Sequence, residues 1–206
     1  MEIDNSGSVF RNNFSGKKVL ITGNTGFKGT WLTFWLLQLG ATVAGYSNEE
    51  RTKPSMYEEL GLSHRIRQFT GDISDFELVK ASINEFSPDF IFHLAAQSIV
   101  STGIRFPLET FKTNTLGTVT VLEALRTLRF KGVAVMITSD KCYENDERET
   151  GYCETDKMGG KDPYSASKGA AELAISSYLR TFLDEDFQLD RKSTRLNSSH
   201  SDRSRM

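Results

Sequence analysis

The chain has 206 residues and a formal net charge of −2; 38% of its residues are hydrophobic and 25% are charged. This size and composition favour one folded domain, and the lack of a basic excess argues against nucleic acid as a partner. No apolar run in the sequence is long enough to span a membrane. The two cysteines have no zinc-binding spacing and the three histidines are scattered, which argues against a metal site and favours a reducing cytoplasm.

Strand-like and helix-like segments alternate along the chain from Lys17. The expected strands are KKVLITG (17–23), ATVAGYS (41–47), IRQFTGD (66–72), DFIFHLAA (89–96) and VAVMITS (133–139). The expected helices cover residues 27–40, 74–86, 107–129 and 163–183, with Ser74 as the N-cap of the second. This alternation predicts an α/β fold of the Rossmann type, a doubly wound parallel sheet with helices on both faces.

The two ends of the chain depart from this pattern. Residues 1–15 are polar and lack the apolar centre of a signal peptide, so we expect a loose leader. We expect the NAD-binding domain over residues 16–187, truncated before a carboxyl-terminal substrate-binding part. Residues 188–206 run into a Ser- and Arg-rich stretch without apolar periodicity. We expect a disordered tail of foreign origin there, and a regulatory tail is the alternative.

Three glycines, Gly23, Gly26 and Gly29, follow the first expected strand and open the first expected helix. This spacing in a strand–turn–helix context is typical of a dinucleotide-binding loop. Missing side chains let the backbone approach a pyrophosphate, and the helix N-terminus stabilises its charge. We expect Thr25 and Phe27, in the same loop, to contact the cofactor as well. The alternative is an ordinary tight turn with close helix–strand packing.

Further cofactor contacts are expected at the carboxyl ends of the other strands, which share one edge of a parallel sheet. Asp72 ends the third strand, where its carboxylate can accept a hydrogen bond from an adenine amino group. The small residues of LAAQ (94–97) end the fourth, as if a flat ring system lay against them. Helix entry and simple packing are the alternatives. The full set of further contacts is Asp72, Ile73, Leu94, Ala95, Ala96, Gln97, Asn114 and Thr138.

The end of the second expected strand bears on the choice of cofactor. An acid at this place often binds the ribose hydroxyls of NAD. Here Ser47 and Asn48 are followed by Glu49, Glu50 and Arg51. The two acids disfavour a 2′-phosphate whereas the arginine attracts one, and the sequence favours NAD over NADP.

Tyr164 and Lys168 stand four residues apart, on one face of the last expected helix. A tyrosine with a pKa of about 10 is a poor base, but a nearby ammonium and a cationic nicotinamide favour its phenolate. The same lysine can bind the cofactor's ribose. The alternative is a pair of surface side chains that snorkel to solvent.

Asp140 and Lys141 follow the fifth expected strand directly, in TSDKCY (138–143). Two charges at this place can simply solvate the end of the strand. Together with a glycine loop and a Tyr–Lys pair, they instead suggest catalytic groups, with Ser139 as a neighbouring hydroxyl.

The motifs TGNTGFKG, GDI, HLAAQ, TSDKCYEN and GGKDPYSASK, in this order, resemble the extended short-chain dehydrogenase/reductase superfamily. More narrowly, they are similar to the CDP-glucose 4,6-dehydratases, for which TGxTGFKGxWL and TSDKCYEN are specific. The resemblance covers residues 16–180 and stops before the part that binds the sugar nucleotide in that family. Residues 101–104 depart from it, and Arg148 stands where a Trp is common.

This resemblance implies an NAD-dependent lyase of nucleotide-sugar and O-antigen biosynthesis, which turns CDP-glucose into CDP-4-keto-6-deoxyglucose and water. Tyr164 would take the proton of the sugar 4-hydroxyl, and Ser139 would share a hydrogen bond with the same oxygen. Asp140 would protonate the leaving 6-hydroxyl. Lys141 would be either a base, neutral because it is buried, or a charged group that stabilises the enolate.

Two other functions remain open. An epimerase or reductase of the same superfamily needs no acid–amine pair after Ser139, and a non-catalytic dinucleotide-binding module commonly lacks the Tyr and Lys. The chain alone is expected to bind NAD weakly without turnover. The expected partners are a nucleotide sugar and a second copy of the chain, through a four-helix contact of residues 107–129 and 163–183.

Overall fold

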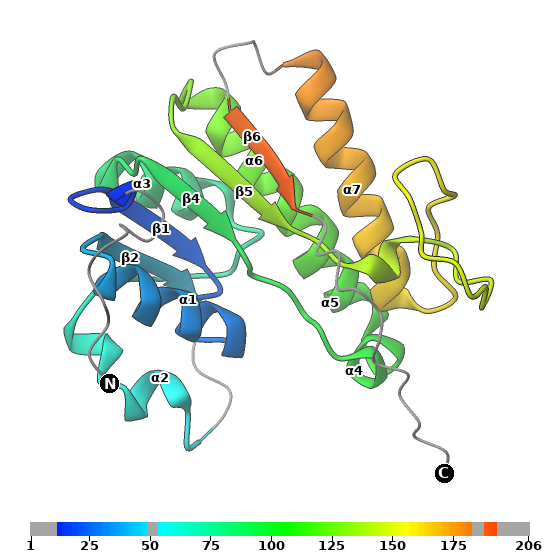
Figure 1. Cartoon of the computed structure of the whole chain (residues 1–206), viewed down its shortest axis with the longest axis horizontal. Coiled ribbons are helices and arrows are strands. Elements are labelled where there is room, and N and C mark those ends of the chain that lie inside the picture. The colour runs from blue at the N-terminus through cyan, green and yellow to red at the C-terminus, as the bar shows by residue number, and fades with distance from the viewer. Residues whose placement is uncertain (1–11, 49–52, 183–187, 193–206) are drawn as a thin grey trace.

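The computed structural model describes residues 12–48, 53–182 and 188–192. Within them, the strands form one parallel sheet of six in the order β3-β2-β1-β4-β5-β6 (Figure 1). The strands are β1 (Lys18–Thr22), β2 (Thr42–Ser47), β3 (Arg67–Thr70), β4 (Phe90–His93), β5 (Val133–Ile137) and β6 (Gln188–Lys192). Strand order reverses between β1 and β4, which is where such sheets bind ligands. The predicted Rossmann-type α/β fold is confirmed.

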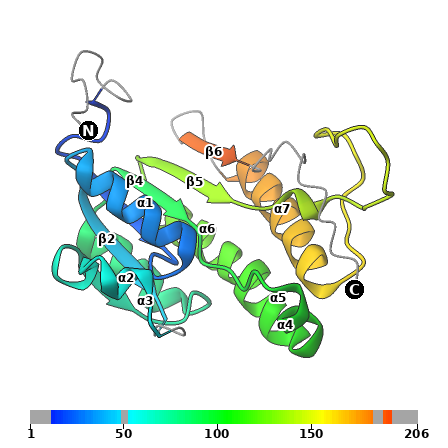
Figure 2. The same cartoon turned by 60° about the horizontal axis from the view of Figure 1, so that its bottom comes forward.

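Helices cover both faces of this sheet and create two cores (Figure 2). On one face, α1 packs through Leu36 against Val19 and Ile21. On the other face, α3, α6 and α7 enclose a larger core that contains Leu20. Alternate side chains of β1 therefore serve opposite faces, as a strand requires. The long helices are α1 (Phe27–Gln38), α3 (Phe76–Phe86), α6 (Gly117–Thr127) and α7 (Pro163–Thr181), and the short ones are α2 (Met56–Glu59), α4 (Val100–Arg105) and α5 (Pro107–Phe111).

The expected helix over residues 107–129 is helical but not uniform. A π-helical turn, Lys112–Leu116, separates α5 from α6, and α6 ends at Thr127. The segment 101–104, which departs from the family pattern, lies within α4. A single π turn inside a longer helix leaves the apolar periodicity of the flanking α-helical turns in place, so the sequence does not reveal it.

The N-cap of α3 is Asp75 and not Ser74 as predicted. The Asp75 carboxylate accepts a hydrogen bond from the Leu78 amide at 3.1 Å. Ser74 is engaged elsewhere, because its hydroxyl donates to Asp72 at 2.9 Å. Both residue types are good caps, and the local hydrogen bonds of Ser74 to Asp72 leave Asp75 as the cap.

The structure describes a part of each expected end segment. The end of the expected leader is packed, since the ring centroid of Phe14 lies 5.1 Å from that of Phe90 on β4. Residues Gln188–Lys192, expected in a disordered tail, form β6 and pair in parallel with β5. Strand pairing uses main-chain groups, which a polar sequence supplies as well as an apolar one. Residues 1–11 and 193–206 lie outside the described residues.

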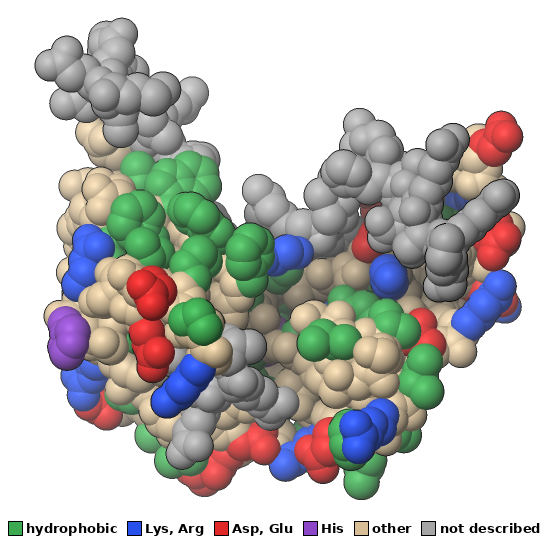
Figure 3. Space-filling model, turned by 90° about the horizontal axis from the view of Figure 1, so that it is seen from below, with side chains coloured by type: hydrophobic (Ala, Val, Ile, Leu, Met, Phe, Trp, Pro, Cys, Tyr) green, Lys and Arg blue, Asp and Glu red, His purple; other side chains and the backbone are tan. Residues whose placement is uncertain are grey.

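Helix α1 buries only one of its sides. Phe27, Trp31 and Trp35, spaced four residues apart, are exposed along the other. The strand arrows of Figure 1 point downward, and from below the surface is hollowed between two raised sides (Figure 3). None of the helices in the described ranges combines the length and hydrophobicity that crossing a membrane requires.

Candidate active site

The glycine loop between β1 and α1 is folded tightly against the end of β4. Gly23 has a φ of +73°, and a Cβ atom on it would lie 2.7 Å from the Ala95 amide nitrogen. A Cβ atom on Gly29 would lie 2.1 Å from the Gly23 carbonyl oxygen. Neither place has room for a side chain, so the loop backbone stays bare. Residues 25–27 stand at the N-terminus of α1, where amide groups lack intrahelical acceptors.

The buried His93, which begins the HLAAQ motif, supports this loop. His93 bonds through Nδ1 to the Thr22 hydroxyl at 2.8 Å and through Nε2 to the Thr118 hydroxyl at 3.2 Å. The Thr22 hydroxyl also accepts the Ala95 amide at 3.2 Å. Burial and the charge of Lys168 lower the pKa of His93 to about 3, so the ring is neutral at physiological pH.

Asn24 anchors the same loop to β2 and β3. Its side chain is fully buried and lies so close to Gly45 that a Cβ atom there would meet it at 2.2 Å. Its Nδ2 donates to Gln68 Oε1 at 2.8 Å, and its carbonyl accepts from the Thr30 hydroxyl at 3.2 Å. No local signal in the sequence indicates this role of Asn24, because its side-chain partner is 44 residues away.

Asp72, predicted to bind an adenine amino group, already has protein partners. Its Oδ1 accepts from the Ser74 amide and hydroxyl, both at 2.9 Å, and its Oδ2 pairs with Lys112 at 2.8 Å. Partial burial opposes ionisation, but the hydrogen bonds from Lys112 and Ser74 outweigh it and lower the pKa of Asp72. The neighbouring Ile73 is buried against Gly117, where a Cβ atom would lie 2.6 Å from its side chain. An adenine would share an ionised carboxylate with these groups.

The end of β2, predicted to select the cofactor, is only partly described. Ser47 is buried and accepts a hydrogen bond from Gln68 Nε2 at 3.2 Å, and Asn48 is exposed. Residues 49–51, with the two acids and the arginine, lie outside the described residues. The preference for NAD over NADP therefore stays a prediction.

The π-helical turn places Asn114 where it joins β4 to α7. Asn114 is buried, accepts from the Gln97 amide at 2.8 Å and donates to the Gln97 carbonyl at 2.9 Å. It also donates to the Ser167 hydroxyl at 2.9 Å, which in turn donates to the Tyr164 carbonyl at 2.7 Å. The loop after β4 and the start of α7 are thereby fixed to each other. A π turn at a functional site is common, because it reorients one side chain.

Asp162 caps α7 and sets the position of the Tyr–Lys pair. Its carboxylate accepts from the amides of Tyr164 and Ser165 at 2.9 and 3.1 Å. Tyr164 is 8% exposed and Lys168 is 5% exposed. Burial and the charge of Lys28 lower the pKa of Lys168 to about 8, which brings its titration close to physiological pH.

The segment after β5 forms a short 3₁₀ turn, Asp140–Cys142, against α7. Ser139 caps it: its hydroxyl accepts the Lys141 amide at 3.3 Å and donates to Asp140 at 3.1 Å. Gly169 permits the approach of α7, since a Cβ atom on it would lie 3.2 Å from the Cys142 carbonyl oxygen. Thr138, just before the turn, is buried.

Asp140 and Lys141 are exposed in this arrangement. The burial invoked from the sequence to make Lys141 a neutral base is therefore not supplied by the described residues. The charge of Lys141 does reach the head of α7. Burial opposes ionisation of Asp162, but hydrogen bonds from Ser165 and Tyr164, aided by Lys141, lower its pKa.

The family model described as GDP-mannose 4,6 dehydratase matches residues 20–187, most of the chain. The chain belongs to this family. CDP-glucose 4,6-dehydratase of Salmonella typhimurium strain LT2 is 46% identical over 176 residues, which are 85% of this chain and 49% of that protein. CDP-paratose 2-epimerase of Salmonella typhi is 32% identical over 183 residues, with 80% of this chain and 54% of that protein covered. The chain thus spans about half the length of the curated relatives it matches.

Solved structures outside the dehydratases share the fold. A UDP-glucose 4-epimerase of Thermus thermophilus, in complex with NAD, is 28% identical with a TM-score of 0.69 over 84% of this chain and 53% of that one. An epimerase of Methanothermobacter thermautotrophicus is 26% identical with a TM-score of 0.75 over 88% and 52%. The resemblance inferred from the motifs is confirmed.

Arg148, the departure from the dehydratase pattern, lies in a hairpin-like excursion closed by a bridge between Tyr143 and Met158. Its guanidinium stacks 4.4 Å from the ring centroid of Tyr152, which stacks in turn on Tyr143 at 5.5 Å. Arg148 also pairs with Asp156. The Arg148 guanidinium is thus held by an ion pair and by an aromatic ring of the same excursion.

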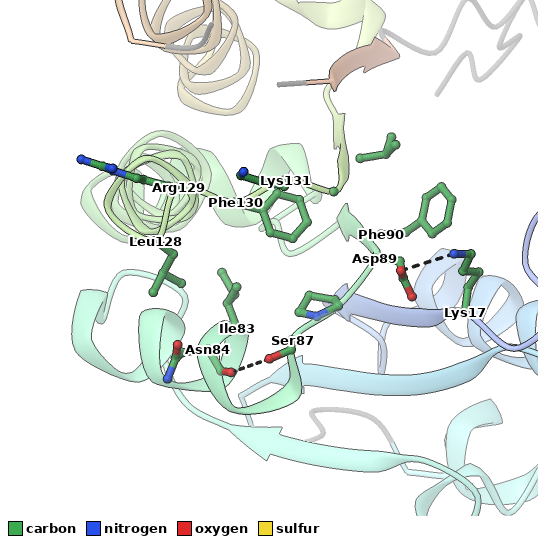
Figure 4. A pocket seen from close by; sticks show the side chains of 13 residues that line it. Lys17, Ile83, Asn84, Ser87, Asp89, Phe90, Leu128, Arg129, Phe130 and Lys131 are labelled. Carbon is green, nitrogen blue, oxygen red and sulfur yellow. Dashed lines mark hydrogen bonds and ion pairs between the residues drawn. The ribbon is translucent and has the colours of Figure 1, made fainter. Parts of the chain in front are cut away.

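A cavity of about 620 Å³ lies at the amino ends of the strands, opposite the predicted site. Lys17 and Asp89, 3.5 Å apart, and the ends of α3 and α6 line it (Figure 4). None of the predicted site residues borders it. Within the described ranges, no group of three or more His, Cys, Asp or Glu side chains is arranged to hold a metal ion.

Proposed function

We propose that this chain is the NAD-binding half of a sugar-nucleotide 4,6-dehydratase, which converts CDP-glucose to CDP-4-keto-6-deoxyglucose and water. The observation that carries this proposal is the packing of the Asp140–Cys142 turn on α7, through Gly169, beside the helix turn of Tyr164. This packing supports a site in which an acid–amine pair acts beside a Tyr–Lys pair. The 46% identity to a CDP-glucose 4,6-dehydratase supports the same reaction.

NAD fits the glycine loop of this chain. The bare backbone at Gly23 and Gly29 and the free amides that open α1 suit a pyrophosphate. Ala95 and Gln97 border the same edge of the sheet, and Lys168 is available to the ribose. When bound, NAD accepts and returns the hydride of the internal redox reaction.

Tyr164 and Lys168 perform the proton transfer at the sugar 4-hydroxyl. The phenolate oxygen of Tyr164 takes that proton, and the Lys168 ammonium stabilises the phenolate. With the pKa of Lys168 near 8, the ammonium form predominates at neutral pH and is lost as the pH rises. Ser139 shares a hydrogen bond with the 4-oxygen.

Asp140 and Lys141 carry out the dehydration. Asp140 protonates the leaving 6-hydroxyl, and Lys141 either removes the proton at carbon 5 or stabilises the enolate as a cation. Both side chains are exposed. The burial that a neutral Lys141 needs would therefore come from the bound substrate and from the carboxyl-terminal substrate-binding part. The two roles are separated by the pH–rate profile of the Lys141→Glu variant, measured in the full-length chimera described below and compared with the unsubstituted chimera. An unchanged basic limb rules out Lys141 as the base.

An epimerase is the second candidate, because the chain is 32% identical to CDP-paratose 2-epimerase. Epimerisation has no leaving hydroxyl to protonate, so the Asp140–Lys141 pair argues for the dehydratase. The presence of Tyr164 and Lys168 argues against a module that only binds dinucleotide.

The function is tested in two steps. The chain itself is titrated with NAD, and saturable binding is expected. A chimera of residues 1–182 with the remaining half of the Salmonella typhimurium relative is then incubated with CDP-glucose and NAD, and the 4-keto sugar is followed by its absorbance in base. A chain that does not bind NAD, or a chimera that binds NAD and forms no keto sugar, contradicts the proposal.

A homodimer is proposed for the same protein, through the helices predicted for it. Leu108 on α5, Leu116 before α6 and Leu173 on α7 are exposed apolar side chains of this helical layer. Helices α5 and α6 both contact α7, so a second copy would meet the three helices as one surface. Sedimentation of the parent against Leu108→Glu/Leu173→Glu tests it, and a monomeric parent contradicts it.

A further inference from the structure

A buried carboxylate on α7 takes no part in the chemistry proposed above. Glu172 stands one turn after Lys168, as Lys168 stands one turn after Tyr164, so the three lie on one side of the helix. Glu172 is 4% exposed. A glutamate is rarely this buried unless it is paired, because desolvation of its charge is costly.

Groups from three segments surround Glu172. Its Oε1 accepts a hydrogen bond from the Thr138 hydroxyl at the end of β5. On α7, its charge opposes the burial and the Lys28 charge that lower the pKa of Lys168. In the 3₁₀ turn, burial and then the Glu172 charge raise the pKa of the Cys142 thiol to about 12. The carboxylate therefore lies where β5, the turn after it and α7 meet.

We propose that Glu172 is a positioning residue whose buried carboxylate holds both the Lys168 ammonium and the Thr138 hydroxyl. Through Thr138, it fixes the end of β5 directly before the acid–amine pair. Through Lys168, it fixes the group that stabilises the Tyr164 phenolate. One carboxylate thus aligns the two catalytic pairs with each other. This role deepens the proposed function, on which its consequence for catalysis rests.

The charge of Glu172 matters as well as its shape. The titratable groups that face Lys168 from the packed elements are Lys28 at the start of α1, neutral His93 on β4, and Glu172. Of these, Glu172 alone is negative. A buried lysine without a counter-charge loses its proton at a lower pH, and neutral Lys168 cannot stabilise a phenolate.

Competitive acetylation of the intact chain across pH tests this directly. Mass spectrometry of the Lys168 peptide, normalised to exposed Lys161, gives the pH at which Lys168 becomes reactive. We expect Glu172→Gln, which keeps a hydrogen-bond acceptor for Thr138, to move that midpoint down by about one pH unit. Glu172→Asp keeps the charge and should move it less. Glu77→Gln, which removes a surface charge from α3, should leave it unchanged.

An unchanged midpoint in Glu172→Gln, or equal shifts in the Gln and Asp variants, overturns the proposal in favour of a packing role. Unfolding of Glu172→Gln, Lys168→Met and the double variant gives a second measurement. Two coupled charges predict that the double variant loses less stability than the sum of the singles, whereas additive losses overturn the proposal. Neither measurement needs NAD. A chain that fails to bind NAD would therefore overturn the proposed function separately.

Discussion

The two ends of the predicted site are built in opposite ways. The glycine loop is enclosed by the chain's own residues, with Gly23 against Ala95 and Asn24 buried on Gly45. The Ser139–Lys141 segment is tied down locally, by the Ser139 cap, and presents its charges to solvent. The first region is held by close packing at Gly23, Asn24 and Gly29. The second region is a turn capped by Ser139, and it exposes the side chains of Asp140 and Lys141 to solvent.

Because of this difference, substitutions in the two regions should affect different properties of the protein. Changes in the glycine loop should damage folding and cofactor binding together, because packing defines its shape. Changes in the 139–141 segment should damage turnover and leave folding nearly intact. The proposed difference is wrong if substitutions in the two regions have the same effects on stability and turnover.

The largest effect is expected for Tyr164→Phe. Loss of the phenol removes the group proposed to transfer the 4-hydroxyl proton, so turnover of the chimera should fall by about 10³-fold. NAD binding should persist, since the ring still fills its buried place. Keto-sugar formation under single-turnover conditions measures the loss. The control is Tyr178→Phe. Tyr178 lies farther along α7, and the change removes a hydroxyl that is hydrogen-bonded to Glu123 on α6. Equal activity of the two variants would remove Tyr164 from the mechanism.

Gly29→Ala should be the most damaging change to the fold of the loop. Its methyl group would overlap the Gly23 carbonyl oxygen, 2.1 Å away, and force the backbone apart. We expect a loss of about 3 kcal/mol in unfolding free energy and at least a tenfold loss in NAD affinity. Urea unfolding and NAD titration measure both. Gly151→Ala, with nothing within 4 Å of the new methyl, should change neither. A loop that accepts the methyl group is not packed as described.

Mild acid should weaken the support of the glycine loop through His93. Its pKa is about 3 in the fold against 6.5 when exposed, so its contribution is complete above pH 6.5 and is lost as the pH falls toward 3. Between pH 6.5 and about pH 4.5 the loss should reach about 2–3 kcal/mol. His93→Gln should flatten this part of the stability profile, whereas His64→Gln, on the surface, should not. Identical slopes for all three proteins would contradict a neutral buried His93.

The smallest effect on stability is expected in the 139–141 segment. Asp140 and Lys141 are exposed, so Asp140→Asn and Lys141→Met should change the unfolding free energy by less than about 0.5 kcal/mol. Both should still lower turnover of the chimera. Chemical denaturation paired with the keto-sugar assay measures the contrast. A destabilisation comparable to that of Gly29→Ala would show that this segment also serves packing.

Strand and helix positions could be predicted from the sequence, because apolar runs and glycine stops reflect burial that any parallel sheet requires. The glycine loop was predicted from the spacing of its glycines between an expected strand and an expected helix, because a bare backbone is what such a loop requires. Strand β6 could not be predicted, because Gln188–Lys192 joins the sheet through main-chain groups. The choice of Asp75 over Ser74 as the N-cap of α3 could not be predicted either, because it depends on the hydrogen bond between the Ser74 hydroxyl and Asp72.

The hydrogen-bonded pairs of buried polar residues that support the candidate site were the main feature that the sequence could not predict. Thr22 and His93 are 71 residues apart, and Thr138 and Glu172 are 34 apart. Thr22, His93 and Thr138 lie in motifs of the sequence, but no motif indicates their partners, and only the fold brings the two members of a pair together. A buried polar residue in a strand or on the inner side of a helix is the one local signal that points to such a partner.

The π-helical turn has a consequence for how the protein can change over evolution. It holds one residue more than a regular turn, so the helix before it is rotated by about 100° from the phase that an uninterrupted α-helix would give. Deleting one residue within Lys112–Leu116 would restore regular hydrogen bonding and raise local helix stability. It would also swing the Asn114 amide away from Gln97 and Ser167. Loss of a single codon there would thus leave a more regular helix and lose the contacts that join the loop after β4 to α7.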